Sequence, residues 1–211
     1  MRIAIFGASG GTGRHVVRQA LSRNHEVIAV VRRPDALAVT DDRLTVCQGD
    51  VLNADCIGQA IKGSDAVISA LGVGNQRTPT TLYSEGVSNL VAALPTAGTS
   101  RLVAISAAPA GPWSETGKFE RLVIYPLLQS FFGAMLDDMR LMEKILTDSE
   151  IDWTIFRPPR LTDHEARGTY RTSTSGPLPH ARTIARSDLA AAVLDAVTDN
   201  SLVQCIVAIA D

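Results

Sequence analysis

Residues 1–17 read MRIAIFGASGGTGRHVV, and this stretch decides the fold. The apolar run Ile3–Phe6 predicts a short buried strand, and the amphipathic pattern that follows predicts a helix. Between them stand glycines at positions 7, 10 and 13. Either these glycines only shape a tight turn, or they clear space for a phosphate group beside the helix N-terminus.

The rest of the chain continues this alternation of short apolar runs and longer amphipathic segments. The runs are rich in Val and Ile and apolar on both faces, which is typical of buried strands in a parallel sheet. They are Ile3–Phe6, Val27–Val31, Leu44–Cys47, Ala66–Ala70, Leu102–Ile105, Trp153–Phe156 and Gln204–Ile209. The predicted helices are Gly13–Arg23, Ala54–Ile61, Leu82–Ala97, Phe119–Thr147 and Asp188–Thr198. This alternation predicts one doubly wound, three-layer α/β domain over residues 1–211, the arrangement of the Rossmann fold.

Composition excludes several classes of protein. The chain has 211 residues, of which 45% are hydrophobic and 20% charged, as in soluble globular proteins. A net charge of −2 argues against a general nucleic-acid binder, and no apolar run reaches the length of a membrane span. The widely spaced Cys47, Cys56 and Cys205 indicate core residues in a reducing compartment and offer no metal site. We therefore expect a cytoplasmic protein without nucleic-acid or membrane partners; its oligomeric state stays open.

The glycine-rich turn lies where a dinucleotide fingerprint requires it, because it follows the first predicted strand and opens the first predicted helix. Glycines let backbone amides approach a pyrophosphate closely, and a helix N-terminus favours an anion. Hydroxyl groups nearby add further donors. We expect the pyrophosphate to be held by Gly7, Ser9, Gly10, Gly11, Thr12 and Gly13.

The residues after the second strand indicate which dinucleotide binds. An NAD site usually has an acidic residue at this position to bond the ribose 2′-hydroxyl. Here Val27–Val31 leads into Arg32 and Arg33, and arginine binds a 2′-phosphate through charge-assisted hydrogen bonds. The alternative is that two surface arginines merely follow a strand. We predict NADP(H), with Arg32 and Arg33 at the 2′-phosphate.

The ends of the next two strands supply contacts to the adenosine half, because cofactors bind beyond the carboxyl ends of parallel strands. Asp50 and Val51 follow the third run and are expected to border the adenine. Asp50 is also a candidate N-cap for the helix over residues 54–61. Ala70, Leu71 and Gly72 end the fourth run and let the nucleotide lie across the backbone.

The last strands reach the nicotinamide half of the predicted site. Ser106 ends the fifth run and is expected to face the reacting ring. Pro158 and Pro159 follow the sixth run and form a rigid turn that can wall the nicotinamide ribose.

These features together resemble a known family. They are GASGGTG at residues 7–13, the arginine after the second strand, Gly49-Asp50-Val51, Ile105-Ser106-Ala107 and DDMRLMEKILTDSEIDWTIFRPPRL at residues 137–161. The chain resembles the atypical short-chain dehydrogenases over nearly its full length. It is most similar to the NAD(P)H-binding branch that contains biliverdin-IXβ reductase, also called flavin reductase, and it also resembles the NmrA-like regulators.

The chain departs from the alcohol-oxidising short-chain dehydrogenases, which use Tyr-x-x-x-Lys. The tyrosines and the residues four places later are Tyr83 and Val87, Tyr125 and Gln129, and Tyr170 and Thr174. If Glu143 marks the usual helix frame, Met135 and Met139 occupy the tyrosine and lysine positions. The resemblance therefore implies hydride transfer by positioning of donor and acceptor, with Ser106 lining the substrate site.

Segments around 109–135 and 160–185 are predicted to lie on the substrate side, the second with a short strand near Thr169–Thr172. We expect Ala108, Trp113 and Arg160 to contact the substrate. Arg160 replaces a histidine of the related reductases and suits an anionic acceptor. The aromatic residues between 113 and 132 either line the acceptor pocket or pack the long helix against the sheet or another subunit; the sequence leaves both open.

The resulting hypothesis is an NADPH-dependent oxidoreductase that transfers hydride to a planar acceptor such as a quinone, a bilin, or FMN or another flavin. A regulator that binds NADP(H) without turnover is the alternative from another class, kept open by the missing Tyr-Lys pair. An isomerase or epimerase is a third. A hydrolase is excluded, because Ser106 has no His and Asp partners near it in any recognisable pattern.

Overall fold

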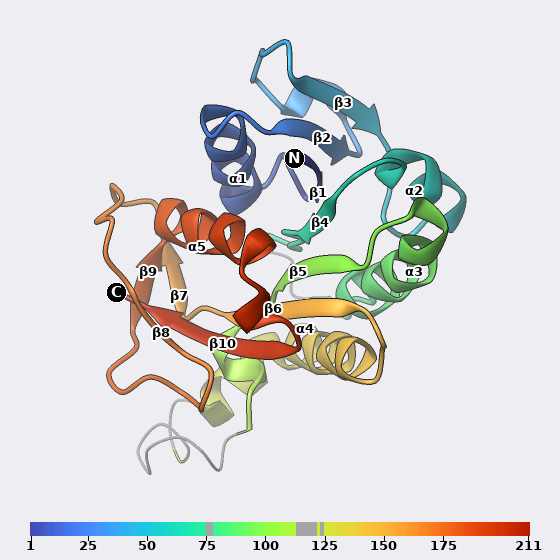
Figure 1. Cartoon of the computed structure of the whole chain (residues 1–211). Coiled ribbons are helices and arrows are strands. Elements are labelled where there is room, and N and C mark those ends of the chain that lie inside the picture. The colour runs from blue at the N-terminus through green and yellow to red at the C-terminus, as the bar shows by residue number, and fades with distance from the viewer. Residues whose placement is uncertain (75–77, 113–121, 123–124) are drawn as a thin grey trace.

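A mostly parallel eight-stranded sheet forms the centre of the computed structural model, which describes residues 1–74, 78–112, 122 and 125–211 (Figure 1). Its strand order is β3-β2-β1-β4-β5-β6-β10-β8, and β7 and β9 form a separate pair. The strands are β1 (Arg2–Phe6), β2 (Glu26–Val31), β3 (Leu44–Gln48), β4 (Ala66–Ser69), β5 (Arg101–Ile105), β6 (Asp152–Arg157), β7 (Arg160–Thr162), β8 (Arg171–Ser173), β9 (Thr183–Ala185) and β10 (Cys205–Ala210). Strand order reverses between β1 and β4, which is where such sheets bind ligands.

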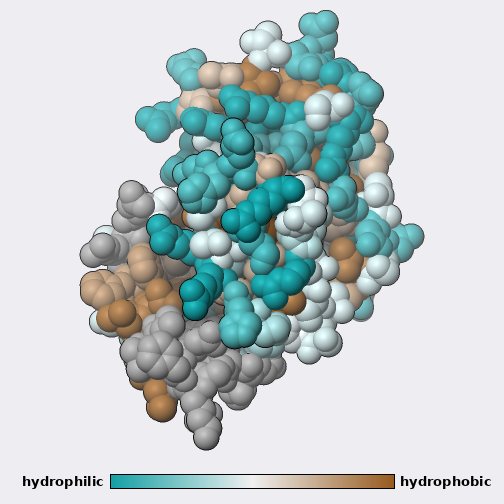
Figure 2. All heavy atoms as spheres, turned by 90° about the vertical axis from the view of Figure 1, so that its left-hand side faces the viewer, coloured by the Kyte–Doolittle hydropathy of each residue, from teal (hydrophilic) through white to brown (hydrophobic). Residues whose placement is uncertain are grey.

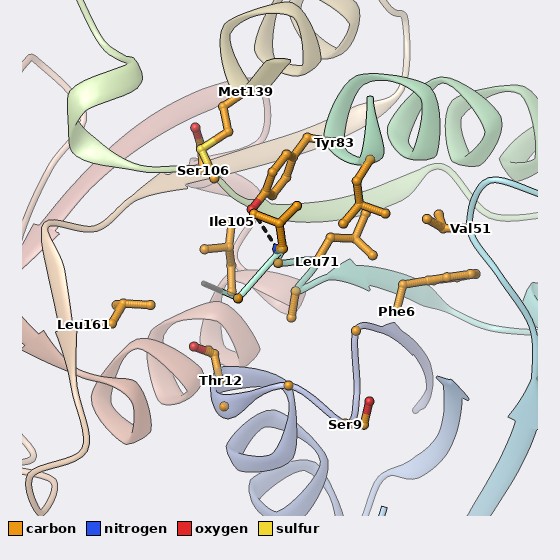
Figure 3. Close-up of a pocket in the computed structure, with 18 of the residues that line it drawn as sticks. Phe6, Ser9, Thr12, Val51, Leu71, Tyr83, Ile105, Ser106, Met139 and Leu161 are labelled. Atoms are coloured by element: carbon orange, nitrogen blue, oxygen red, sulfur yellow. Dashed lines mark hydrogen bonds between the residues drawn. The ribbon is translucent and has the colours of Figure 1, made fainter. Parts of the chain in front are cut away.

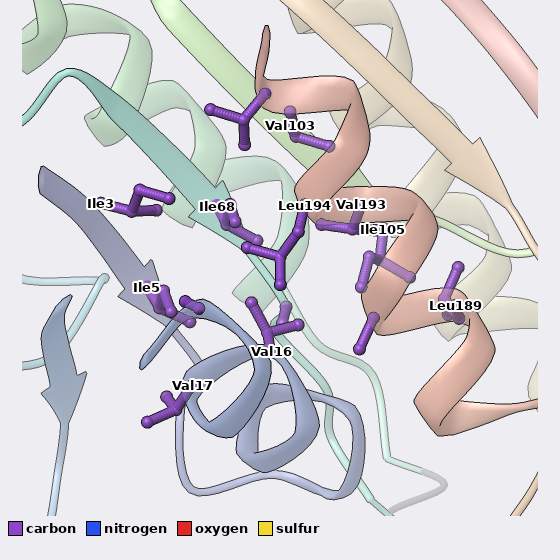
Figure 4. Close-up of a cluster of buried hydrophobic side chains, with 14 of the residues drawn as sticks. Ile3, Ile5, Val16, Val17, Ile68, Val103, Ile105, Leu189, Val193 and Leu194 are labelled. Carbon is purple, nitrogen blue, oxygen red and sulfur yellow. The ribbon is translucent and has the colours of Figure 1, made fainter. Parts of the chain in front are cut away.

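Helices cover both faces of the sheet, so the expected three-layer arrangement is confirmed. They are α1 (Gly11–Ser22), α2 (Ala54–Ile61), α3 (Leu82–Ala97), α4 (Tyr125–Thr147) and α5 (Arg186–Thr198), with short 3-10 turns η1 (Pro34–Ala36), η2 (Ala108–Ala110) and η5 (Asn200–Leu202). On one face, α1 and α5 pack Val16, Val17 and Leu189 against sheet residues such as Ile5 and Val103 (Figure 4). On the other face, α2, α3 and α4 cover a second apolar cluster.

The predicted elements are present, with corrections at the sheet's edges. The run Leu44–Cys47 was expected to be a buried strand. It forms most of β3, which is an edge strand, and Val46 is 38% exposed. The strand predicted near Thr169–Thr172 is β8, which pairs antiparallel with β10, so the sheet is not wholly parallel. The cysteines are half-buried free thiols, of which Cys47 and Cys205 pack against the apolar clusters without being fully buried. β7 and β9 were missed because three-residue strands with polar positions carry little periodic signal.

The segment between β7 and β9 is attached to α5 through one buried carboxylate. Asp188 is 2% exposed and accepts the backbone N–H groups of Arg167 and Gly168, at 2.9 and 3.1 Å. β7 also pairs in parallel with β9, directly before α5 begins. Both ends of this segment are therefore held near the start of α5.

None of the helices within the described residues is long and apolar enough to cross a membrane. Figure 2 shows one face largely covered by hydrophilic residues, with hydrophobic areas near its top and at its lower left. Among the described residues of α4, Phe131 and Phe132 are 50% and 37% exposed. Neither side chain belongs to the two buried apolar clusters on the faces of the sheet, and the role of the aromatic residues stays a prediction.

Candidate functional site

A cavity of about 440 Å³ lies at the carboxyl ends of the strands, at the point where strand order reverses. Most residues predicted to bind the cofactor line it. These are Gly7, Ser9, Gly10, Gly11, Thr12, Arg32, Asp50, Val51, Ala70, Leu71, Gly72, Ser106, Pro158 and Pro159. Gly13 and Arg33 do not line it. The fold thus brings together residues that are up to about 150 positions apart in sequence.

Two of the glycines are required by the packing of the turn itself. Gly7 has φ +76°, and a Cβ there would lie 2.3 Å from the carbonyl oxygen of Ala70. A Cβ on Gly13 would lie 2.1 Å from the carbonyl oxygen of Gly7. The Gly10 N–H donates to that same Gly7 oxygen at 2.9 Å. The turn interpretation therefore accounts for Gly13, whereas Gly10 and Gly11 present backbone to the cavity.

The N-terminus of α1 opens into the cavity without a side-chain cap. The N-cap residue is Gly10, which has no side chain to accept hydrogen bonds from the helix. The first amides of α1 therefore have no partner within the helix. The buried Thr12 and the half-buried Ser9 stand on either side of this glycine backbone. Such a helix terminus favours an anion through its free N–H groups and its dipole.

A cation that the sequence analysis missed lies beside this helix terminus. Arg186, the first residue of α5, lines the cavity, and a Cβ on Gly11 would lie 2.8 Å from its Nε atom. Its guanidinium also pairs with Asp163 at 2.7 Å. No local pattern marks Arg186, because only the packing of α5 against α1 brings it to the glycine turn.

At the end of β2, the two adjacent arginines differ. Arg32 lines the cavity, and its carbonyl oxygen accepts a hydrogen bond from Gln48 Nε2 at 3.4 Å. Arg33 is exposed, lies outside the cavity lining and directly precedes η1. Successive side chains of an extended segment point to opposite sides, which separates the two guanidinium groups.

The loop after β3 is held in place by α3. Val51 is buried, and its carbonyl oxygen accepts from Asn89 Nδ2 at 3.0 Å. Asp50 Oδ1 accepts the Leu52 N–H at 3.0 Å within the loop. The expected capping role of Asp50 is wrong, because Asn53 is the N-cap of α2. Asp50 stands too far before the helix to reach its first amides.

Three side chains form the wall of the cavity opposite the glycine turn, as Figure 3 shows for Tyr83, Ser106 and Met139. Ser106 is 4% exposed, and its Oγ has no hydrogen-bond partner among the described residues. Tyr83 is 2% exposed, and its hydroxyl oxygen accepts the Val73 N–H at 3.3 Å. Burial raises the pKa of the Tyr83 hydroxyl above its usual value, partly offset by this hydrogen bond.

Tyr83 is positioned by a carboxylate from another helix. Asp138 of α4 is 6% exposed and accepts the backbone N–H groups of Tyr83 and Ser84, at 2.9 and 3.3 Å, and also the Ser84 hydroxyl. It thereby caps the N-terminus of α3 from outside that helix. The sequence does not mark this capping role of Asp138, because a capping residue normally stands directly before the helix that it caps.

The residues predicted to contact the substrate are not brought to one place. Ala108 lines a second cavity of about 390 Å³, which shares Pro159 with the first. Arg160 is exposed on β7 and lines neither cavity, whereas Arg157 lines the second. Trp113 lies outside the described residues. Within the part of the chain that the structure describes, no cluster of His, Cys, Asp and Glu side chains has the makings of a metal site.

Comparison with known proteins adds independent information. Residues 7–200 match the sequence profile of the family described as NAD(P)H-binding. Bacillus subtilis YwnB is 29% identical over 207 residues, which cover 92% of this chain and 91% of YwnB. Three mycobacterial relatives match 49% of this chain, and the match spans only 12% of their own length.

Solved structures share the fold. The anaerobillin reductase ChuY from Escherichia coli O157:H7 has a TM-score of 0.82 and 23% identity, covering 100% of this chain and 97% of that chain. A short-chain dehydrogenase/reductase from Veillonella parvula DSM 2008 in complex with NADP has a TM-score of 0.80 and 17% identity, covering 100% and 94%. At these identities the likeness establishes the doubly wound architecture.

Proposed function

This chain belongs to the NAD(P)H-binding family, and from this premise we propose that it is an oxidoreductase that binds NADP(H) and transfers hydride from NADPH to a planar conjugated acceptor. Flavins, quinones and bilins are acceptors of this class. The observation that carries the proposal is the cavity at the strand ends, which extends from the glycine turn and Arg32 to Ser106.

The residues that line the cavity fit a dinucleotide phosphate. The glycine turn provides backbone without side chains, and the uncapped start of α1 provides free N–H groups. Arg186 would add a cation at the pyrophosphate, and Arg32 would bind the 2′-phosphate. Val51 and Leu71 would cover the adenine and its ribose. When bound, NADPH supplies a hydride from its nicotinamide ring.

The wall near Ser106 suits a conjugated acceptor better than an alcohol. Alcohol oxidation requires a base within reach of the hydroxyl proton, and α4 presents the thioether of Met139 to the cavity. A conjugated acceptor can take its proton from water, so holding the two rings together accounts for most of the acceleration. The neighbour ChuY, an anaerobillin reductase, supports this choice of acceptor, and the NADP complex of the Veillonella neighbour supports NADP(H) as the cofactor.

The direct test is NADPH oxidation by the purified protein in the presence of FMN, with menadione and biliverdin as further acceptors and NADH in parallel. We expect protein-dependent oxidation that prefers NADPH. Tight NADPH binding without oxidation across the acceptor panel would overturn the reductase proposal and favour a regulator that senses NADP(H). Absence of binding to either nucleotide would overturn both.

A further inference from the structure

Two buried hydroxyl groups in the cavity each have a hydrogen without an acceptor among the described residues. The Oγ atom of Ser106 makes no hydrogen bond to any described residue. The oxygen of Tyr83 accepts the Val73 N–H, but its O–H group donates to no described residue. Buried polar groups normally have partners, so two such groups on one wall of one cavity indicate a ligand atom that accepts from them.

The Tyr83 hydroxyl is held with its O–H group left to donate. The Val73 N–H occupies a lone pair of the oxygen, which polarises the phenol and strengthens its O–H as a donor. Asp138 fixes the backbone of Tyr83 through the α3 cap, which limits how far the ring can move. This arrangement is typical of a donor that is organised before its ligand arrives.

We propose that the hydroxyl groups of Tyr83 and Ser106 form a two-donor site for one carbonyl oxygen of the hydride acceptor. This inference rests on the proposed function and narrows its substrate class: the acceptor carries a carbonyl group conjugated with the atom that receives the hydride. At this wall of the cavity, Tyr83 of α3 supplies a hydroxyl donor, whereas α4 supplies only the thioether of Met139.

The electron balance explains why two donors are useful. Hydride brings its electron pair to the acceptor atom, and the π electrons shift along the conjugated system so that the carbonyl oxygen gains the negative charge. NADPH is oxidised to NADP⁺, the acceptor is reduced, and the oxygen carries a negative charge until it takes a proton from water. Donors aimed at this oxygen stabilise the charge as it develops. A tyrosine hydroxyl is protonated at neutral pH, as a donor must be, and burial raises the pKa of Tyr83 further from that range.

The test compares Tyr83→Phe and Ser106→Ala with wild type, using menadione and methylene blue as acceptors. Menadione has conjugated carbonyl groups, whereas methylene blue is planar and has none. We expect Tyr83→Phe to lower kcat with menadione about 100-fold, with unchanged KM for NADPH and a rate within about twofold with methylene blue. Ser106→Ala should show the same acceptor dependence.

The matched control is Tyr170→Phe, which removes a phenol hydroxyl that bonds Asp195 and does not line the cavity. It should leave both rates unchanged. Equal losses with both acceptors in Tyr83→Phe would show a merely structural role and overturn the inference, as would an undiminished menadione rate.

A binding measurement keeps the inference testable without turnover. The 4-nitrophenolate anion mimics the charged carbonyl oxygen, and two donors should lower the pKa of 4-nitrophenol bound to the NADP⁺ complex. We expect this shift in wild type and its loss in Tyr83→Phe, followed by visible absorbance. The same pKa in both would overturn the two-donor site. If wild type reduces neither acceptor, the proposed function fails, and this titration decides on the two-donor site alone.

Discussion

Replacing Arg32 with alanine should affect the binding of NADPH and NADH differently, because the 2′-phosphate is the feature that distinguishes NADPH from NADH. Arg32 lines the cavity at the end of β2, whereas its neighbour Arg33 does not. The variant Arg33→Ala is therefore a matched control that removes the same charge one residue away. We expect Arg32→Ala to weaken NADPH binding and to leave NADH binding unchanged.

The magnitude follows from the setting of the guanidinium. A hydrogen bond to a charged group contributes about 1.5–3 kcal/mol, but an exposed ion pair contributes only about 0.2–1 kcal/mol. Arg32 is exposed and would use more than one N–H on the phosphate. We therefore expect a loss of about 1.4–2.7 kcal/mol, which raises the Kd for NADPH about 10- to 100-fold.

Isothermal titration of NADPH and NADH into wild type, Arg32→Ala and Arg33→Ala measures this directly. Added salt should weaken NADPH binding to wild type more than to Arg32→Ala, because the lost interaction is ionic. Equal losses for both nucleotides in Arg32→Ala would refute the placement of the 2′-phosphate. A larger effect from Arg33→Ala would refute it as well.

Two further changes test the site and its support. Arg186→Ala should raise the Kd of NADPH and of NADH by the same factor, about tenfold, because both nucleotides contain the pyrophosphate. The control is Asp163→Ala, which removes only the ion-pair partner of Arg186 and should not weaken nucleotide binding. A selective loss for one nucleotide in the same titration would contradict this placement. Asp138→Ala should lower the free energy of unfolding by about 1–2 kcal/mol, since α3 loses its cap. The control is Asp137→Ala, at an exposed neighbouring position, which should change the free energy of unfolding by less than about 0.5 kcal/mol. Equal losses in urea unfolding would contradict the capping role.

Local chemistry made much of the cofactor side predictable. The turn that contains Gly7, Ser9 and Gly10 lies between a strand and a helix, and the residues next to it in sequence predict both elements. Arg32 directly follows a predicted strand. The end of a parallel strand fixes where the next residues lie, so Asp50 was placed correctly at the cavity even though its capping role was not.

The acceptor side was less predictable because distant segments meet there. Tyr83 was noted only for the absence of a lysine four residues later, and it reaches the cavity because Asp138 holds the start of α3. Arg186 reaches the glycine turn through the packing of α5 on α1. Arg160 was expected to meet the substrate but lies on the short strand β7 with its side chain exposed. Hydrophobic periodicity carries no information about such meetings between helices.

The attachment of the β7–β9 segment bears on which parts of this scaffold can vary without disturbing the glycine turn. Asp188 and the β7–β9 pairing hold both ends of the segment near α5. The stretch between them, including residues 174–178, borders the second cavity but not the first. Substitutions or insertions in this stretch can therefore reshape the neighbouring cavity while the glycine turn keeps its geometry. Variation of the second cavity and retention of the glycine turn are in this way assigned to separate parts of the chain.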